Sequence, residues 1–76
     1  MKEVLTTIIT SLVEFPEQVS IEEIADEKSI VFKVTVASTD MGKVIGREGK
    51  IAGAIRTVMK ALGSKETKRV TVEFVG

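Results

Sequence analysis

The sequence predicts an α+β fold, a three-stranded mixed sheet covered on one face by three helices. Two patterns support this prediction: strict alternation of apolar residues over 29–37, and apolar residues at helical spacing over 2–14 and 50–62. Two helical segments separate the strand at 29–37 from a second apolar strand at 69–75. A strand–helix–strand crossover of this kind joins parallel strands with right-handed connectivity.

The first half of the chain predicts one helix and two antiparallel strands. Residues 2–14 form the helix, which Pro16 ends because the residue before a proline disfavours helical conformation. Residues 18–25 form a weaker edge strand, and the polar turn 26–28 joins it to the strand at 29–37. The inward residues of these elements are Val4, Leu5, Ile8, Ile9, Leu12 and Val13 in the helix, and Ile30, Phe32, Val34 and Val36 in the second strand.

The second half predicts two helices and the last strand. Residues 38–40 supply N-cap candidates for a short helix over about 40–45. A longer helix over 50–62 is followed by Gly63, which fits a left-handed stop. The inward residues are Ile51, Ile55, Val58, Met59 and Leu62 in the long helix, and Val70, Val72 and Phe74 in the strand.

Composition limits the classes of function. The 76 residues, 43% of them hydrophobic, predict one small domain over residues 1–76. The chain has no Cys and no His, which removes thiolate ligands, the commonest metal ligand and the commonest general base. We therefore expect no metal, no cofactor and no catalysis. No apolar run approaches the roughly 20 residues of a membrane span, and no signal peptide is recognisable, so we expect a cytoplasmic protein.

Charge is divided unevenly along the chain, although the net charge is zero. Residues 1–40 carry three Lys against eight Asp or Glu, and residues 41–76 carry eight Lys or Arg against three Glu. This division predicts a molecule with one basic face.

The basic residues cluster around residues 44–51, which read Val-Ile-Gly-Arg-Glu-Gly-Lys-Ile. Gly46 and Gly49 allow a tight turn whose backbone a ligand can approach closely. A helix begins directly after the turn, and the positive end of its dipole favours an anion. Lys43, Arg47 and Lys50 add three cations. The motif therefore predicts a phosphate site.

The residues around the turn extend this prediction to a nucleic-acid strand. Val44, Ile45 and Ile51 are candidates for an apolar surface against which bases pack, and Arg56 for an extension of the basic track. Ile45 and Ile51 also fit core positions, and Lys43 also fits a solvated charge at a helix end. With three Phe and no Tyr or Trp, the chain lacks an aromatic platform. Stacking contributes about 1–3 kcal/mol per base, so we expect weak binding by one domain, strengthened by dimerisation or a partner.

The order α-β-β-α-α-β, with Gly-x-x-Gly between the second and third helices, resembles the type II KH fold over essentially the whole chain. Residues 43–52 and 54–57 are similar to the small bacterial single-KH proteins of the KhpA family. The resemblance implies binding of about four nucleotides of single-stranded RNA without strong sequence preference. It also implies a homodimer or pairing with a second KH protein, and a role as an RNA chaperone or post-transcriptional regulator. Glu48 departs from the usual basic or polar residue and is expected to lower affinity modestly, by about 1 kcal/mol at contact distance.

A second hypothesis is a protein-interaction module that dimerises on a KH scaffold without touching nucleic acid. The zero net charge, Glu48 and the acidic first half favour it. The turn lacks the Gly-Lys-Ser/Thr ending of a P-loop and the third glycine of a dinucleotide fingerprint, which argues against a nucleotide enzyme. Two surfaces are candidates for a dimer interface: the helix 50–62 with the glycine turn, and the outer face of the first helix.

Overall fold

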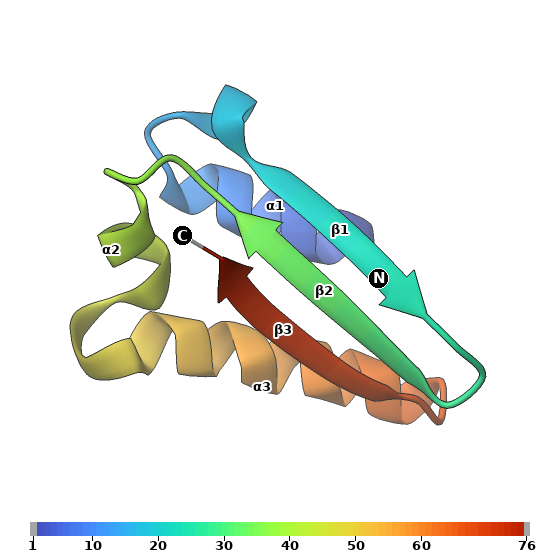
Figure 1. The fold of residues 1–76 in the computed structure, drawn as a ribbon. Helices are drawn as coiled ribbons and strands as arrows, with labels where there is room; N and C mark the ends of the chain where they lie inside the picture. Colours follow the sequence, from blue (N-terminus) through green and yellow to red (C-terminus); the bar gives the residue numbers. More distant parts are fainter. Residues whose placement is uncertain (1, 76) are drawn as a thin grey trace.

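The computed structural model describes residues 2–75, with the exception of the Arg47 side chain. The elements follow the predicted order (Figure 1): α1 (Lys2–Leu12), β1 (Ser20–Ala25), β2 (Ser29–Thr35), α2 (Met41–Ile45), α3 (Lys50–Lys65) and β3 (Arg69–Val75). Two short 3₁₀ turns, η1 (Pro16–Gln18) and η2 (Arg47–Gly49), lie between them.

The three strands form one mixed sheet in the order β1-β2-β3. β1 pairs antiparallel with β2, and β2 pairs parallel with β3, so that Phe32 lies opposite both Glu23 and Val72. All three helices lie on one side of this sheet, and its other face is open (Figure 1). The α+β fold predicted from the sequence is therefore confirmed, including the parallel crossover.

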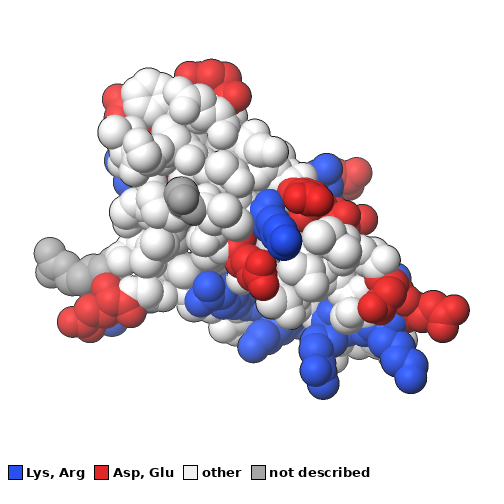
Figure 2. All heavy atoms as spheres, viewed as in Figure 1, with Lys and Arg blue, Asp and Glu red and all other residues white. Residues whose placement is uncertain are grey.

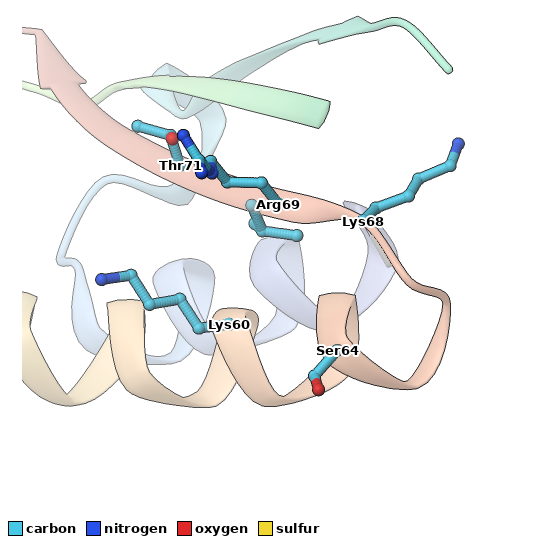
Figure 3. Close-up of a pocket in the computed structure, with 6 residues that line it drawn as sticks. Lys60, Ser64, Lys68, Arg69 and Thr71 are labelled. Carbon is cyan, nitrogen blue, oxygen red and sulfur yellow. The ribbon is translucent and has the colours of Figure 1, made fainter. Parts of the chain in front are cut away.

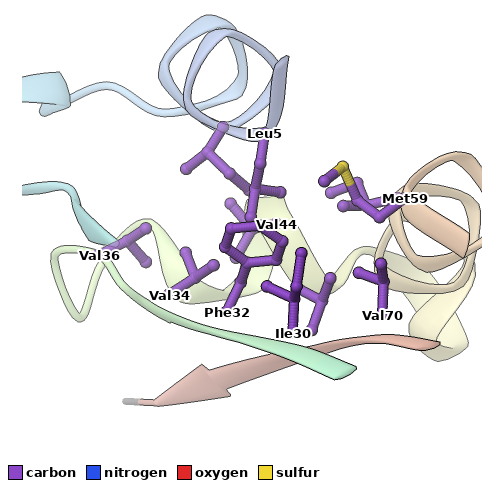
Figure 4. Packing of buried hydrophobic residues seen from close by; sticks show 11 residues of the cluster. Leu5, Ile30, Phe32, Val34, Val36, Val44, Met59 and Val70 are labelled. Carbon is purple, nitrogen blue, oxygen red and sulfur yellow. The ribbon is translucent and has the colours of Figure 1, made fainter. Parts of the chain in front are cut away.

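The core lies between the sheet and the helices, and Phe32 occupies its centre (Figure 4). Alternate residues of β2 point into it, as the sequence pattern predicted. Burying each large apolar side chain contributes about 1.5–3 kcal/mol. The buried cluster is Leu5 and Ile9 from α1, Ile30, Phe32 and Val34 from β2, Val36 beyond it, Val44 from α2, Ile55 and Met59 from α3, and Val70 and Val72 from β3.

Besides the end of α3, three element ends differ from the sequence prediction. The first helix ends at Leu12 instead of residue 14, because the N–H groups of Glu14 and Phe15 donate to the Asp40 carboxylate. The first strand begins at Ser20 instead of residue 18, because Pro16–Gln18 form η1. The second strand ends at Thr35, two residues earlier than predicted.

Gly63 does not stop the last helix, and that prediction was wrong. α3 continues to Lys65, and Thr67 takes the left-handed conformation instead, with φ +57°. The Lys68 N–H donates to the Gly63 carbonyl at 2.9 Å, and the Thr67 N–H donates to the Ser64 carbonyl at 3.2 Å, which is the Schellman pattern. Gly63 is buried because β3 packs on it: a Cβ there would collide with Val70 and lie 2.8 Å from the Lys68 carbonyl oxygen.

Candidate nucleic-acid interface

The backbone of the Gly46–Gly49 turn requires glycine at both of these positions, for different reasons. Gly46 has φ 73° and ψ 179°, a combination found essentially only in glycine. A Cβ at Gly46 would lie 2.6 Å from Cγ1 of Ile51, so a side chain there would also collide with α3. Glu48 and Gly49 are left-handed, with φ 57° and 75°, and Gly49 has open space around it. The first glycine is therefore required by conformation and contact, the second by conformation alone.

The turn leads directly into the N-terminus of α3. The first four N–H groups of a helix lack intrahelical acceptors, and a side chain at the N-cap commonly satisfies one of them. Here the N-cap is Gly49, which has no side chain, and α3 extends for 16 residues beyond it. These amides and the positive end of the helix dipole are therefore available to an anion.

The predicted cations around the turn are not equivalent. Lys50 is the first residue of α3 and is exposed. The Lys43 Nζ lies 3.5 Å from Oε2 of Glu14 and 3.6 Å from Oδ1 of Asp40, and so is turned toward the chain that follows α1. Glu14 is exposed, and pairs of this kind contribute about 0–1 kcal/mol, so a phosphate can replace it as the partner of Lys43. The Arg47 side chain lies outside the described part of the structure, and its role stays a prediction.

Asp40 is a positioning residue that the sequence showed only as a capping candidate. It sits at the N-cap of α2, but its carboxylate makes no cap bond there. Oδ1 and Oδ2 instead accept the backbone N–H groups of Glu14 and Phe15, each at 3.0 Å. Burial acts to raise the pKa of Asp40, but these two donors and Lys43 outweigh it, and the net pKa lies below its ordinary value. An ionised, fully buried carboxylate thus fixes the start of α2 against the end of α1.

The three apolar candidates divide into two groups. Ile45 and Ile51 are each 37% exposed and flank the turn, where a base can pack on them. Val44 has no accessible surface and belongs to the core, so it supports α2 from inside and presents nothing to a ligand. Val44 and Ile45 differ in exposure because adjacent residues of a helix point in directions about 100° apart.

Arg56 lies on α3 beside β3, and not at the turn. Its Nε donates to the Val72 carbonyl at 3.2 Å, and its guanidinium carbon lies 5.4 Å from the centre of the Phe74 ring. Along the helix it is about 9 Å from Lys50, from a rise of about 1.5 Å per residue. Lys and Arg side chains gather along the margin of the molecule formed by α3 and the turn into β3 (Figure 2). Arg56 therefore belongs to a basic track that runs away from the glycine turn.

The described residues include no group of three His, Cys, Asp or Glu side chains placed to hold a metal ion. Within the same part of the chain, no helix combines the length and the apolar character that a bilayer crossing needs.

Comparison with known proteins decides the family. The family model described as "KhpA/KhpB, KH domain" matches residues 2–74. The chain belongs to the KhpA/KhpB KH-domain family. "RNA-binding protein KhpA" of Clostridium acetobutylicum is 53% identical over 75 residues, covering 99% of this chain and 100% of that protein. The KhpA proteins of Clostridium perfringens and Listeria monocytogenes are 51% and 41% identical over the same length, covering 99% of this chain and 100% and 99% of those proteins. The KH resemblance inferred from the sequence is thereby confirmed over nearly the whole chain.

Proposed function

We propose that this chain binds single-stranded RNA without catalysis, in the cytoplasm, as an RNA chaperone or post-transcriptional regulator. The observation that carries the proposal is the uncapped N-terminus of α3 behind a turn whose first glycine admits no side chain. Membership of the KhpA/KhpB family and relatives named as RNA-binding proteins support the same function. The turn and the amides of α3 would hold the phosphates, with Lys50 and Arg47 beside them, while Ile45 and Ile51 contact bases.

A second feature of α3 favours action as a dimer or with another KH protein. Residues spaced three and four apart form a stripe along one flank of the helix. Ile51 and Val58 in this stripe are 37% and 44% exposed, and the two alanines between and beyond them are exposed as well. The stripe consists of Ile51, Ala54, Val58 and Ala61. The part of this stripe beyond Ile51 suits a protein contact that leaves Ile51 to the bases, and two joined domains would compensate for weak binding by one.

The same stripe supports the alternative function, a dimerisation module that does not bind nucleic acid. Lys43 supports it too, because acidic groups of the same chain already surround its charge. The two functions differ in what the glycine turn does: RNA binding needs its charge, and dimerisation alone does not.

The discriminating experiment is a titration of fluorescently labelled, unstructured RNA at two salt concentrations. The label belongs on the RNA because the chain has no Trp or Tyr. The test variant carries Arg47→Asp and Lys50→Asp, and the matched control carries Lys2→Asp and Lys65→Asp, the same change of charge on exposed residues away from the turn. Circular dichroism establishes that both variants fold.

RNA binding predicts salt-sensitive affinity that the turn variant loses and the control retains. If the wild-type protein fails to bind at low salt, or the turn variant binds as well as the control, the RNA-binding proposal is wrong. Sedimentation of the same samples then measures whether the chain self-associates.

A further inference from the structure

β1 is an edge of the sheet, and its outer backbone groups have no strand to bond. The order β1-β2-β3 gives β1 a neighbour on one side only, and Figure 1 shows no strand beyond it. The Asp26 N–H donates to the Ser29 carbonyl at 2.8 Å, which makes these two residues a hydrogen-bonded pair at the end of the β1–β2 ladder. Hydrogen-bonded and non-hydrogen-bonded pairs alternate along an antiparallel ladder. The backbone N–H and C=O groups of Ile21, Glu23 and Ala25 therefore point outward, away from β2.

The side chains along this edge are acidic. Residues 16–27 include five carboxylates and no Lys or Arg, and all five carboxylates are exposed. Among the described side chains, the only ion pairs are those of Lys43, so none of the five is paired with a cation. Figure 2 shows acidic side chains along the margin of β1 and at the tip of the β1–β2 turn. The five residues are Glu17, Glu22, Glu23, Asp26 and Glu27.

Glu22 and Glu23 stand at the middle of β1, on opposite faces of the sheet. Glu23 is the register partner of Phe32 and so lies on the helix side. Glu22 is the partner of Lys33, on the open face. The next residue of β1 on the open face is Ile24, which is 47% exposed. Because successive residues of any strand alternate between the two faces, a strand lying against β1 would meet Glu22 and Glu23 with two consecutive residues and Ile24 with the next one.

Charge decides which kind of chain fits this edge. Like charges directly opposite one another destabilise a strand pair, so two copies of β1 are poor partners for each other. The same carboxylates repel the phosphates of a nucleic acid. The opposite edge of the sheet is basic, because Lys60, Lys68 and Arg69 come from α3, β3 and the turn between them (Figure 3). A cationic peptide strand is therefore attracted to β1 and repelled by β3.

We propose that β1 binds an extended basic segment of a partner protein by strand addition. Two consecutive Lys or Arg residues of the partner would lie against Glu22 and Glu23, and an apolar residue against Ile24. In this mode of recognition the backbone hydrogen bonds supply affinity and the side chains supply specificity. The site does not depend on RNA binding, because α3 packs against β3, at the other edge of the sheet.

The test titrates the protein with fluorescently labelled, threonine-rich peptides and measures anisotropy. One peptide carries an apolar residue followed by two consecutive lysines. The matched peptide has the same composition but separates the lysines by one residue, which places both on one face. The edge variant of the protein carries Glu22→Gln and Glu23→Gln. The control variant carries Glu3→Gln and Glu66→Gln, the same change of charge on exposed residues outside β1.

The peptide with consecutive lysines should bind the wild type more tightly than the matched peptide. Two cross-strand charge pairs correspond to about 2–30-fold in affinity, which the edge variant should lose and the control variant should keep. Methylating the backbone nitrogen of one lysine should abolish binding and methylating the other should not, because only alternate N–H groups of an added strand face β1. Hydrogen exchange followed by NMR should show that the amides of Ile21, Glu23 and Ala25 exchange rapidly in the free protein and slowly in the complex.

Several results would overturn the proposal. Equal binding of the two peptides, or an equal loss in the two variants, would reduce the attraction to net charge. Equal effects of the two methyl groups would show that no strand is added. Slow exchange of the three outward amides in the free protein, increasing with protein concentration, would assign the edge to a second copy of the chain. If no peptide binds at low salt, β1 does not accept a basic strand.

Discussion

Substituting Gly46 by alanine is the most direct test of how the glycine turn is built. At φ 73° and ψ 179°, a residue with a side chain is strained by about 1–3 kcal/mol. The new Cβ also lies 2.6–2.9 Å from three side-chain carbons of Ile51, and relieving such overpacking costs about 1–3 kcal/mol more. We expect Gly46→Ala to lower the free energy of unfolding by about 2–6 kcal/mol, a large part of the roughly 4–11 kcal/mol typical for 76 residues.

Urea denaturation followed by far-ultraviolet circular dichroism measures this loss. For a small domain the urea slope is about 1 kcal/mol per molar at the lower limit, so the midpoint falls by up to about 1 M for each kcal/mol lost. Gly49→Ala is the matched control, because Gly49 is left-handed but has nothing within 4 Å of a new Cβ. It should cost only the backbone strain, about 1–2 kcal/mol.

Shortening the partner side chain reduces the collision but not the strain, and keeps the test informative if Gly46→Ala does not fold. In an Ile51→Ala background the contacts with Cγ1 and Cδ1 are absent and only the contact with Cβ at 2.8 Å remains, so Gly46→Ala should cost less than it does in the wild type. Equal losses for Gly46→Ala and Gly49→Ala, or a loss that Ile51→Ala does not reduce, would refute the assignment of this contact.

Three further predictions concern stability. Gly53→Ala should raise the free energy of unfolding by about 1 kcal/mol, because its new Cβ meets nothing within 4 Å, whereas Gly63→Ala in the same helix should lower it by about 1–3 kcal/mol through collision with Val70. Thr67→Gly should raise it by about 1 kcal/mol, because φ +57° is unfavourable for threonine. Asp40→Asn should be less stable than the wild type at neutral pH. Because the folded pKa of Asp40 is lowered, its stabilising effect is complete above its unfolded pKa of about 3.9 and is lost as pH falls through the folded value, so the difference should close in acid.

Urea midpoints measure all three, the last as a series from about pH 7 to pH 3. Shifts of the same sign for the two glycine variants would contradict the packing of β3 on Gly63. A Thr67→Gly protein no more stable than the wild type would show that the left-handed threonine is unstrained. A difference for Asp40→Asn that stays constant into acid would rule out a stabilising ionised carboxylate.

Local patterns in the sequence predicted most of the fold, because local physics determines them. The alternation over β2 and the helical spacing over α1 and α3 each follow from one buried face per element. The inward assignment was wrong for Val4, Ile51 and Val58, which are exposed. The parallel pairing of β2 with β3 followed from the helical crossover that joins them. A turn at Gly46–Gly49 could be predicted because the positive φ of each glycine is a local requirement.

Contacts between distant residues account for the parts that the sequence did not predict. Gly63 resembled a helix stop, but β3 returns across it and excludes a side chain. Asp40 resembled a helix cap, but its partners are amides 25 and 26 residues earlier. Val44 was a candidate for contact with bases, but the orientation of α2 against the sheet buries its side chain. Arg56 was expected to be free for a ligand, yet it is already bonded to β3.

The bond from Arg56 to β3 also bears on how this protein avoids aggregation. β3 has a neighbouring strand on one side only, and strands in that position can template the addition of strands from other molecules. Arg56 donates to the Val72 carbonyl and places its charge over the Phe74 ring, so an incoming strand must displace a hydrogen bond and pass an exposed cation. Arg56 thus obstructs the addition of a strand at the middle of β3, whereas β1, the other edge strand, has no such bond from the described side chains.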